Sequence, residues 1–358
     1  MKIACLVSGG VDSSVALKMA LDAGNDITAF YLKIWLEDET SFLGECPWEE
    51  DLAYVRKTCE QFSIPLEVVP LQKEYYARVV SYALEEVRRG RTPNPDVLCN
   101  STVKFGAFLE WLEKKGKIFN KVVTGHYAGV EEQEGSYQLK MSKDNIKDQT
   151  YFLSRLSQKQ LSKAWFPLGA YSKKEIRERA VEWKLPSANR PDSQGLCFLG
   201  KINYADFIQH HLGKKEGNII DEDTNAILGR HKGHWLYTIG QRTGLNLSGG
   251  PWYVSGKNVE KNSIFVSHRL KMSERERNIF DISDMQFLEK EEKFNEGELY
   301  QVKVRHGAQI YSCTVEKLEE RGTYRVRLLD VYERGIAPGQ FAVFYKEDVC
   351  LGSGIVSC

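Results

Sequence analysis

The sequence lacks a net charge, a long apolar run and any Cys-x-x-Cys pair. Its 358 residues include 49 Lys and Arg against 49 Asp and Glu, which excludes a generally polycationic nucleic-acid coat but not a local basic patch. No apolar run approaches the ~20 residues needed to cross a bilayer. The N-terminal apolar stretch breaks at Gly9, too early for a signal peptide. We therefore expect a cytoplasmic protein that does not contact a membrane.

The cysteines and histidines show no metal-binding spacing. The eight cysteines are Cys5, Cys46, Cys59, Cys99, Cys197, Cys313, Cys350 and Cys358. A structural zinc site is poorly supported, and a disulfide framework is not expected in a large cytosolic chain. Each cysteine is by default a small buried apolar residue. Structural or surface roles are expected for His126, His210, His211, His231 and His234.

The chain is long enough for two or three domains, and 42% hydrophobic with 27% charged residues predicts a packed globular fold. Residues 1–200 alternate short apolar strands with helices, which predicts an α/β domain with a parallel sheet and helices on both faces. Residues 201–275 mix a short helix with glycine-rich, strand-like pieces. Residues 276–358 have period-2 strands, which predict a small β-barrel.

The expected elements follow from these patterns. Strands are expected at 2–7, 27–34, 66–71, 121–124, 300–305, 311–318, 323–329, 340–345 and 350–356. Helices are expected at 12–23, 48–62, 74–89, 103–115, 158–163, 172–184 and 204–211.

Charge is unevenly distributed along the chain. Residues 1–60 carry 5 Lys and Arg against 11 Asp and Glu, whereas residues 141–190 carry 11 against 5. A handful of phosphate contacts is enough for counterion release, so the second segment is a candidate nucleic-acid surface. A solvated helix surface explains the same charges, because residues 172–184 are helical in pattern.

The most specific motif is Ser8-Gly9-Gly10-Val11-Asp12-Ser13-Ser14, between the first strand and the first helix. Glycines let the backbone turn tightly, and a helix N-terminus offers free N–H groups and partial positive charge to a phosphate. The string has neither the Gly-Lys-Ser/Thr ending of a Walker A loop nor the Gly-x-Gly-x-x-Gly of a dinucleotide fold. It resembles the PP-loop of ATP pyrophosphatases, which split ATP into AMP and pyrophosphate.

Two cysteines lie in loops whose sequences are compatible with a reactive thiol. Cys99 follows the segment Arg91 to Asp96, where two prolines rigidify the loop before a helix. Cys99 would lie near that helix's N-terminus, where a thiolate is favoured, and Asp96 would be within reach to exchange a proton. Cys197 lies in the glycine-flanked string Asp192 to Gly200. Taken alone, each string is also compatible with an ordinary connector.

Together, these motifs resemble the tRNA-specific 2-thiouridylase family (MnmA-type) of the PP-loop ATP pyrophosphatase superfamily. Further matching stretches are Thr124 to Tyr127, Lys147 to Gln149, Tyr151 to Leu153, Phe166 to Gly169, Tyr237 to Arg242, Pro251 to Val254 and Ala337 to Gln340. The resemblance covers nearly the whole chain. It implies a Rossmann-like PP-loop ATP-binding catalytic domain (1–200), a central tRNA-binding or linker domain (201–275) and a C-terminal β-barrel domain (276–358).

The resemblance also implies the site residues. ATP would be held by Leu6, Val7, Ser8, Gly9, Gly10, Val11, Asp12, Ser13, Leu32 and Gly125. The target uridine would contact Asn94, Pro95 and Asp96. The rest of the tRNA would contact Lys147, Asp148, Gln149, Arg305 and His306. Cys197 would carry a persulfide, with Cys99 as its partner and Asp96 as the proton-transfer group.

Three positions depart from the family's usual residues. Leu32 replaces a methionine but keeps an apolar contact, and Gln194 replaces a threonine. His306 replaces a tyrosine, and a histidine can also stack on a base.

The implied activity is ATP-dependent 2-thiolation of the tRNA wobble uridine. Transfer of AMP to the C2 oxygen would make it a good leaving group, and Mg²⁺ would neutralise the departing pyrophosphate. Persulfide sulfur would then attack directly, or Cys99 would release it as hydrosulfide. Either path leaves a Cys99–Cys197 disulfide, so a reductant and a persulfide donor, such as a cysteine desulfurase or sulfur-relay protein, are implied partners. The base must leave the anticodon stack to react.

Three other functions compete with this one. Another PP-loop ligase would share residues 8–14 but need neither Cys99 nor Cys197. A non-catalytic tRNA-binding protein would bind tRNA without consuming ATP. A thiol oxidoreductase is disfavoured because the chain has no Cys-x-x-Cys motif.

Overall fold

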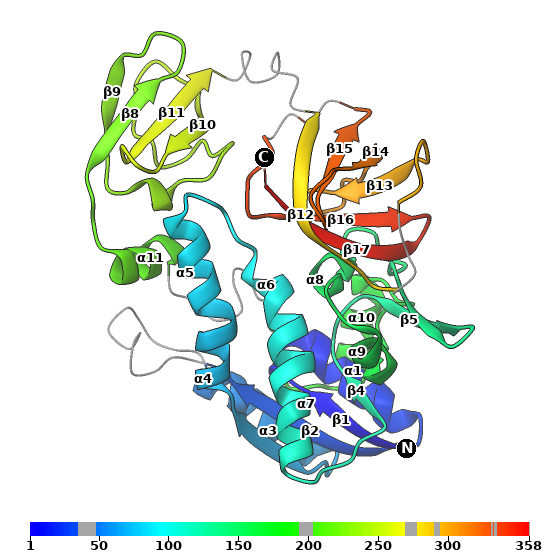
Figure 1. The fold of residues 1–358 in the computed structure, drawn as a ribbon. Helices are drawn as coiled ribbons and strands as arrows, with labels where there is room; N and C mark the ends of the chain where they lie inside the picture. The colour runs from blue at the N-terminus through cyan, green and yellow to red at the C-terminus, as the bar shows by residue number, and fades with distance from the viewer. Residues whose placement is uncertain are drawn as a thin grey trace.

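The computed structural model describes residues 1–34, 48–192, 203–268, 278–289, 294–330, 332 and 335–357. Figure 1 shows three bodies: a parallel sheet with its helices, a small central β-sheet beside one end of α5, and a C-terminal barrel. The predicted Cys197 and Gln194 lie outside the described residues. Within the described part of the chain, no helix is both long and apolar enough to span a membrane.

The first body is built on a five-stranded parallel sheet of order β3-β2-β1-β4-β7. Its strands are β1 (Lys2–Leu6), β2 (Asp26–Lys33), β3 (Leu66–Pro70), β4 (Lys121–Val123) and β7 (Ala164–Trp165). The sheet agrees with the predicted alternation, except that β7 was not expected. β1 is central and apolar, as expected for a strand covered on both faces.

Helices cover both faces of this sheet because successive side chains of a strand point in opposite directions. On one face, Ile3 and Cys5 pack in a cluster with side chains of α1 (Val11–Asp22), α3 (Trp48–Gln61) and α10 (Lys173–Glu182). On the other face, Ala4 and Leu6 join the cluster that contains Cys99. The prediction of helices on both faces is confirmed.

Two long helical stretches cover the second face, and each contains a π-helical segment. One runs through α4 (Gln72–Tyr75), η2 (Tyr76–Val80) and α5 (Ser81–Arg88). The other runs through α6 (Pro95–Leu98), η3 (Cys99–Ala107) and α7 (Phe108–Lys114). The expected start of the second helix at residue 103 is wrong. Pro95 is the first helical residue, where its fixed φ suits a helix and its missing N–H costs nothing.

A hairpin that the sequence did not predict links this body to the barrel. It consists of β5 (Gly129–Gln133) and β6 (Ser136–Lys140), and β6 pairs with barrel strand β17 (Val349–Val356) through Leu139 and Cys350. The short helices α8 (Thr150–Leu153) and α9 (Gln158–Lys163) follow the hairpin.

The central body has its own small sheet and core. Its sheet has the order β10-β11-β8-β9, formed by β8 (Gly217–Asp221), β9 (Ile227–His231), β10 (Trp252–Asn258) and β11 (Ser263–His268). Helix α11 (Tyr204–Leu212) and the 3₁₀ turn η4 (His234–Leu236) complete it. The core residues are Ile219, Leu245, Val254, Ile264 and Val266.

The C-terminal body is an antiparallel barrel of order β12-β15-β14-β13-β16-β17, closed by pairing of β12 with β17. Its strands are β12 (Ile279–Phe287), β13 (Tyr300–Lys303), β14 (Tyr311–Lys317), β15 (Tyr324–Leu328), β16 (Phe341–Lys346) and β17. The predicted barrel is confirmed, and β12 adds a strand to the five expected. Closure removes the free edges that an open sheet would expose.

Candidate functional site

The glycine loop lies at the carboxyl end of β1 and turns directly into α1. Gly9 has φ +79°, and a Cβ atom there would lie 2.5 Å from the Asp51 carbonyl oxygen, so only glycine fits. Gly10 occupies the N-cap position without a side-chain cap hydrogen bond. The Ser13 hydroxyl instead accepts from the Ser8 N–H at 3.1 Å. The first N–H groups of α1 are therefore directed at a place where an anion can bind.

Gly125, which is expected beside the nucleotide, lies against this loop. It follows β4, and a Cβ atom at this position would come within 2.7 Å of the Asp12 carbonyl carbon and the Ser13 nitrogen. Two residues later, the Tyr127 hydroxyl donates to Asp12 Oδ1 at 2.8 Å. Leu32, near the carboxyl end of neighbouring strand β2, is half-buried. The predicted ATP-binding residues therefore gather at one end of the sheet.

Three cations converge on Asp192 beside the glycine loop. Asp192 Oδ1 lies 2.8 Å from Lys173 Nζ and 2.6 Å from Arg177 Nη2, and its Oδ2 lies 2.7 Å from Lys147 Nζ. Lys173 also reaches Asp12 Oδ1 at 2.6 Å. Burial alone would raise the pKa of Asp192, but the hydrogen bonds from Lys147 and Lys173 outweigh it and hold that pKa below its usual range.

Arg190 brings a further cation to the loop. Its Nη1 donates to the Gly9 carbonyl at 2.9 Å, and its Nη2 pairs with Asp51 Oδ1 at 2.8 Å. Its guanidinium carbon also lies 4.3 Å from the Tyr54 ring centroid. Sequence reasoning missed Lys173, Arg177, Arg190 and Asp192 as site residues. The excess of basic residues in 141–190 marks the segment that holds the three cations but not which of them reach the loop, and Asp192 lies outside that segment.

The expected uridine contacts lie at the start of α6. Asn94 is the N-cap, and its Oδ1 atom is buried without a hydrogen-bond partner among the described residues. The Asn94 side chain also hydrogen-bonds Tyr151, whose hydroxyl donates to the Phe341 carbonyl in the barrel at 2.9 Å. Pro95 and Asp96 form the first helical turn. A buried, incompletely satisfied amide is a candidate for a polar ligand.

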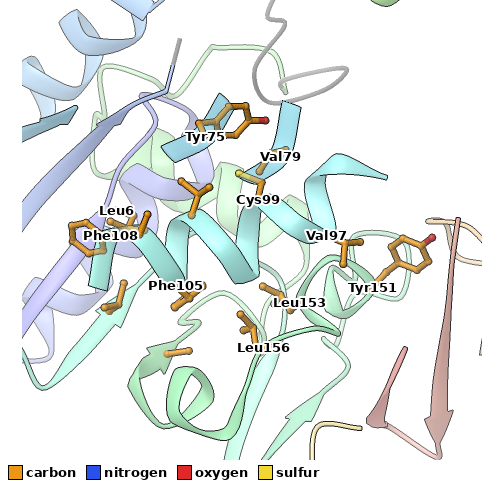
Figure 2. Close-up of a cluster of buried hydrophobic side chains, with 14 of the residues drawn as sticks. Leu6, Tyr75, Val79, Val97, Cys99, Phe105, Phe108, Tyr151, Leu153 and Leu156 are labelled. Carbon is orange, nitrogen blue, oxygen red and sulfur yellow. The ribbon is translucent and has the colours of Figure 1, made fainter. Parts of the chain in front are cut away.

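Cys99 differs from the expectation of a thiol at a helix N-terminus. It lies in the second turn of the helix and is 1% exposed. Figure 2 shows it in the apolar cluster close to Val79, with Tyr75 nearby. Because Pro95 starts the helix early, Cys99 points into the core and not toward the helix end. Any reaction of its sulfur requires that the cluster open.

Of the expected tRNA contacts, Asp148 is buried and Gln149 is half-buried. The Asp148 side chain is 0% exposed, and its Oδ2 lies 2.8 Å from Nζ of Lys303 in the barrel. Its Oδ1 accepts from the Ser142 N–H at 3.1 Å. Gln149 accepts from the Tyr127 N–H at 3.0 Å. The Asp148 carboxylate is therefore not placed to touch tRNA, whereas Lys147 remains partly exposed at 38%.

Arg305 and His306 lie at the end of β13, on the side of the barrel that faces α8. Arg305 Nη2 donates to the carbonyls of Ile239 at 3.1 Å and Gly335 at 2.9 Å, so it joins the central body to the barrel. The exposed His306 ring stacks on Phe152, with 4.4 Å between centroids. A stacked, exposed ring retains the capacity to meet a base.

The motifs at 237–242 and 337–340 meet the loop that leads to Asn94. The Thr92 N–H donates to the Pro338 carbonyl at 2.7 Å, and Gln340 Nε2 donates to the Thr92 carbonyl at 2.7 Å. The hydroxyls of Thr92 and Thr238 are 3.3 Å apart. All three bodies therefore contact this loop.

The histidines that the structure describes make other contacts. Among the described residues, no group of three or more His, Cys, Asp and Glu side chains could hold a metal ion. His126 Nδ1 lies 2.7 Å from the Thr124 hydroxyl, and His234 Nδ1 lies 3.1 Å from Asn262 Oδ1. These contacts agree with the structural roles expected from the sequence.

Three family models match successive parts of the chain. They are the tRNA methyl transferase HUP domain over residues 1–201, the tRNA methyl transferase PRC-barrel domain over 205–268, and the aminomethyltransferase beta-barrel domain over 277–356. These ranges follow the three bodies of the fold.

Curated relatives match the chain from end to end. The tRNA-specific 2-thiouridylase MnmA of Parabacteroides distasonis is 44% identical and covers 99% of this chain and 99% of its own length. The MnmA protein of Porphyromonas gingivalis is 44% identical, covering 100% of this chain and 99% of its own. MnmA 1 of Bacteroides thetaiotaomicron is 44% identical over 100% of both chains. The chain therefore belongs to the tRNA-specific 2-thiouridylase family.

Proposed function

We propose that this protein is a tRNA-uridine 2-sulfurtransferase that uses ATP to thiolate C2 of the wobble uridine. One observation carries the proposal. Asp192 is tied through Lys173 to Asp12 in the first turn of α1. Asp192 therefore lies beside a helix N-terminus suited to a phosphate, and in the sequence it is five residues from Cys197, the expected sulfur carrier. The full-length relatives, which are named for this activity, support it.

ATP would bind with its phosphates on the N–H groups of α1 and on the Ser8 and Ser13 hydroxyls. Lys173 and Arg190 would add positive charge close to those phosphates. The adenine would lie near Leu32, and Gly125 would border the nucleotide without a side chain to obstruct it.

Asp12 fits a role as an oxygen ligand for a Mg²⁺ ion that arrives with ATP. Mg²⁺ in nucleotide sites is held by one or two carboxylates together with phosphates and water. Asp12 is an acidic residue in the first turn of α1, immediately beside the loop. When bound, the ion supplies charge neutralisation for the departing pyrophosphate.

In the first chemical step, the uridine C2 oxygen would attack the α-phosphorus of ATP, and pyrophosphate would leave. Asn94, Pro95 and Asp96 would hold the extruded base, with the buried Asn94 Oδ1 as a free acceptor for its N–H. Asp96 would accept or return the proton. This step converts a poor leaving group into AMP.

In the second step, the terminal sulfur of a Cys197 persulfide would attack C2, and the C2–O bond would break with release of AMP. The Cys99 thiolate would then attack the inner sulfur of Cys197, which breaks the S–S bond and frees 2-thiouridine. A Cys99–Cys197 disulfide remains, and a two-electron reductant restores both thiols. In the alternative order, Cys99 attacks first and releases hydrosulfide, which displaces AMP. A cysteine desulfurase or a sulfur-relay protein would reload Cys197.

The proposal is tested with unmodified tRNA, Mg-ATP and a persulfide donor, by measuring 2-thiouridine and AMP. The wild type is compared with Cys197→Ser, Cys99→Ser and the control Cys59→Ala. Burial raises the pKa of Cys59 to about 11, so this thiol is inert and its loss should leave both products unchanged. Cys197→Ser, assayed also for pyrophosphate, should still release this product of the first step but make neither AMP nor 2-thiouridine, because AMP leaves only when sulfur attacks C2.

Other results would favour other functions. Full thiolation by Cys197→Ser would refute the persulfide role. AMP without 2-thiouridine from the wild type, with a donor shown competent on a control enzyme, would favour a different PP-loop ligase. Bound tRNA with neither product would favour a non-catalytic binding protein.

A further inference from the structure

The helix that carries Cys99 is wider than an α-helix where the cysteine stands. The π-helical segment η3 begins at Cys99 and ends at Ala107, between two α-helical parts. Such segments are rare and are frequently found at functional sites.

Two side chains from other elements donate to carbonyl oxygens of this turn. Gln160 Nε2, on α9, donates to the carbonyls of Ser101 at 2.7 Å and Phe105 at 2.9 Å. Arg78 Nη1, in the neighbouring π segment η2, donates to the Thr102 carbonyl at 2.9 Å. These donors satisfy acceptors in a helix whose own hydrogen bonding is irregular.

Other contacts hold these donors and the helix in place. The Arg78 guanidinium forms a two-pronged ion pair with Glu110, at 2.9 and 2.7 Å. Within η3, a Cβ atom at Gly106 would lie 3.0 Å from the Ser101 oxygen, five residues earlier. A glycine at this position lets the widened turn close without a clash. The sequence therefore accommodates the irregular turn at several points.

The π turn determines the direction in which the side chains at the start of this helix point. Phe105 and Phe108 anchor the later part of the helix in the core, at 1% and 0% exposure. If the turn tightened by one residue to α geometry, the part before it would rotate by about 100° relative to those anchors. Cys99 and Asp96 would then leave their present directions.

We propose that Gln160 and Arg78 are positioning residues for sulfur transfer, because they hold the π turn that directs Cys99 and the base-binding residues before it. The inference rests on the proposed function of Cys99. Neither side chain is expected to touch ATP, base or sulfur.

Gln160 offers a test that separates positioning from simple helix capping. Its Oε1 accepts from the Ser157 N–H at 2.8 Å in a capping box, while its Nε2 donates to the carbonyls of the π turn. Gln160→Glu keeps the cap acceptor and loses both donors. Gln160→Lys keeps a donor and loses the cap acceptor.

Gln158 supplies the matched control on the same helix. Its Nε2 donates to the carbonyls of Tyr137 at 2.9 Å and Leu288 at 2.9 Å, outside the helix of Cys99. Gln158→Glu therefore removes two comparable donors without touching the π turn.

The experiment measures kcat and KM for 2-thiouridine formation and the rate of Cys99 alkylation by iodoacetamide without substrates. We expect Gln160→Glu to lower kcat by about tenfold or more and to speed alkylation by a similar factor, with the KM for ATP unchanged. Gln160→Lys and Gln158→Glu should stay within about threefold of the wild type.

The inference is overturned if Gln160→Glu and Gln158→Glu behave alike, or if Gln160→Lys is the more damaged of the two Gln160 variants. If Gln160→Glu fails to fold, Arg78→Met tests the same claim through the Thr102 carbonyl, and unchanged alkylation of Cys99 in it would overturn the inference. If the wild type makes no 2-thiouridine, the proposed function fails, while the alkylation rates still decide whether these residues hold Cys99.

Discussion

Removal of Lys303 should uncouple the barrel from the ATP-binding body. The Lys303 and Asp148 side chains are 1% and 0% exposed, and their charged atoms are 2.8 Å apart. In the variant Lys303→Met, the donors that remain to the Asp148 carboxylate among the described residues are the Thr150 hydroxyl at 2.8 Å and the Ser142 N–H at 3.1 Å. A buried ion that loses its partner costs about 3–5 kcal/mol.

Loss of the ion pair between Lys303 and Asp148 should lower both the stability and the activity of the protein. Asp148 lies between Lys147, which pairs with Asp192, and Gln149, which accepts from the Tyr127 N–H. We therefore expect Lys303→Met to lower the free energy of unfolding by about 3–5 kcal/mol in urea titrations and to weaken ATP binding. The double variant Lys303→Met/Asp148→Asn removes both charges and should recover most of the stability.

Lys140 provides the control for this prediction. It forms exposed ion pairs with Glu131 of β5 at 2.9 Å and with Asp348, in the turn before β17, at 3.5 Å. Exposed ion pairs contribute about 0–1 kcal/mol to stability, so Lys140→Met should lower the free energy of unfolding only slightly. The reasoning is refuted if Lys303→Met costs no more than Lys140→Met, or if the double variant is less stable than the single one.

Three further predictions concern the site. Gly125→Ala should weaken ATP binding by about tenfold or more in calorimetry, since its Cβ would lie 2.7 Å from loop backbone, whereas Gly129→Ala, with its nearest atom at 3.4 Å, should not. Asp192→Asn should lower the free energy of unfolding at neutral pH. Because the folded-state pKa of Asp192 is lowered, its contribution is present above the ordinary pKa and lost as pH falls through the folded one, so melting curves of variant and wild type should converge in acid. Gln340→Ala removes a donor to the Thr92 carbonyl and should lower kcat/KM for tRNA by about tenfold, with ATP binding unchanged.

The local parts of the fold could be predicted from the sequence. The apolar β1, the glycine loop and the helix from Val11 follow one another in a pattern that only a strand–turn–helix satisfies. The barrel strands could be predicted because buried and exposed side chains alternate along them, as in β14. These elements are specified by residues close together in the chain.

The misplaced elements depend on distant partners. The hairpin at 129–140 is polar and half-exposed. Its two strands pair with each other, and it joins the larger sheet through the pairing of Leu139 with Cys350 of the barrel. The helix from Pro95 was expected to start later, because a two-proline string is typical of a connector. Its start is supported by Gln340 and Pro338, which lie far along the sequence.

The residues of the candidate site also divide into those specified by their neighbours in the sequence and those that depend on distant partners. Gly9 and Asp12 could be found from a motif whose chemistry is local, and Gly125 from the family resemblance. The cations Lys173 and Arg190 could not, because their role depends on the approach of α10 and the segment after it to the loop. Asp148 was expected to contact tRNA from the family resemblance, whereas the distant Lys303 holds its carboxylate in the interior.

The most direct test of the central claim follows the sulfur atom itself. Enzyme loaded with a radiolabelled persulfide on Cys197 would be mixed with unmodified tRNA and Mg-ATP in a single turnover, and the nucleosides would then be analysed. The account predicts label in 2-thiouridine at the wobble position, with one AMP released for each labelled base. AMP release with the label still on the protein would contradict it.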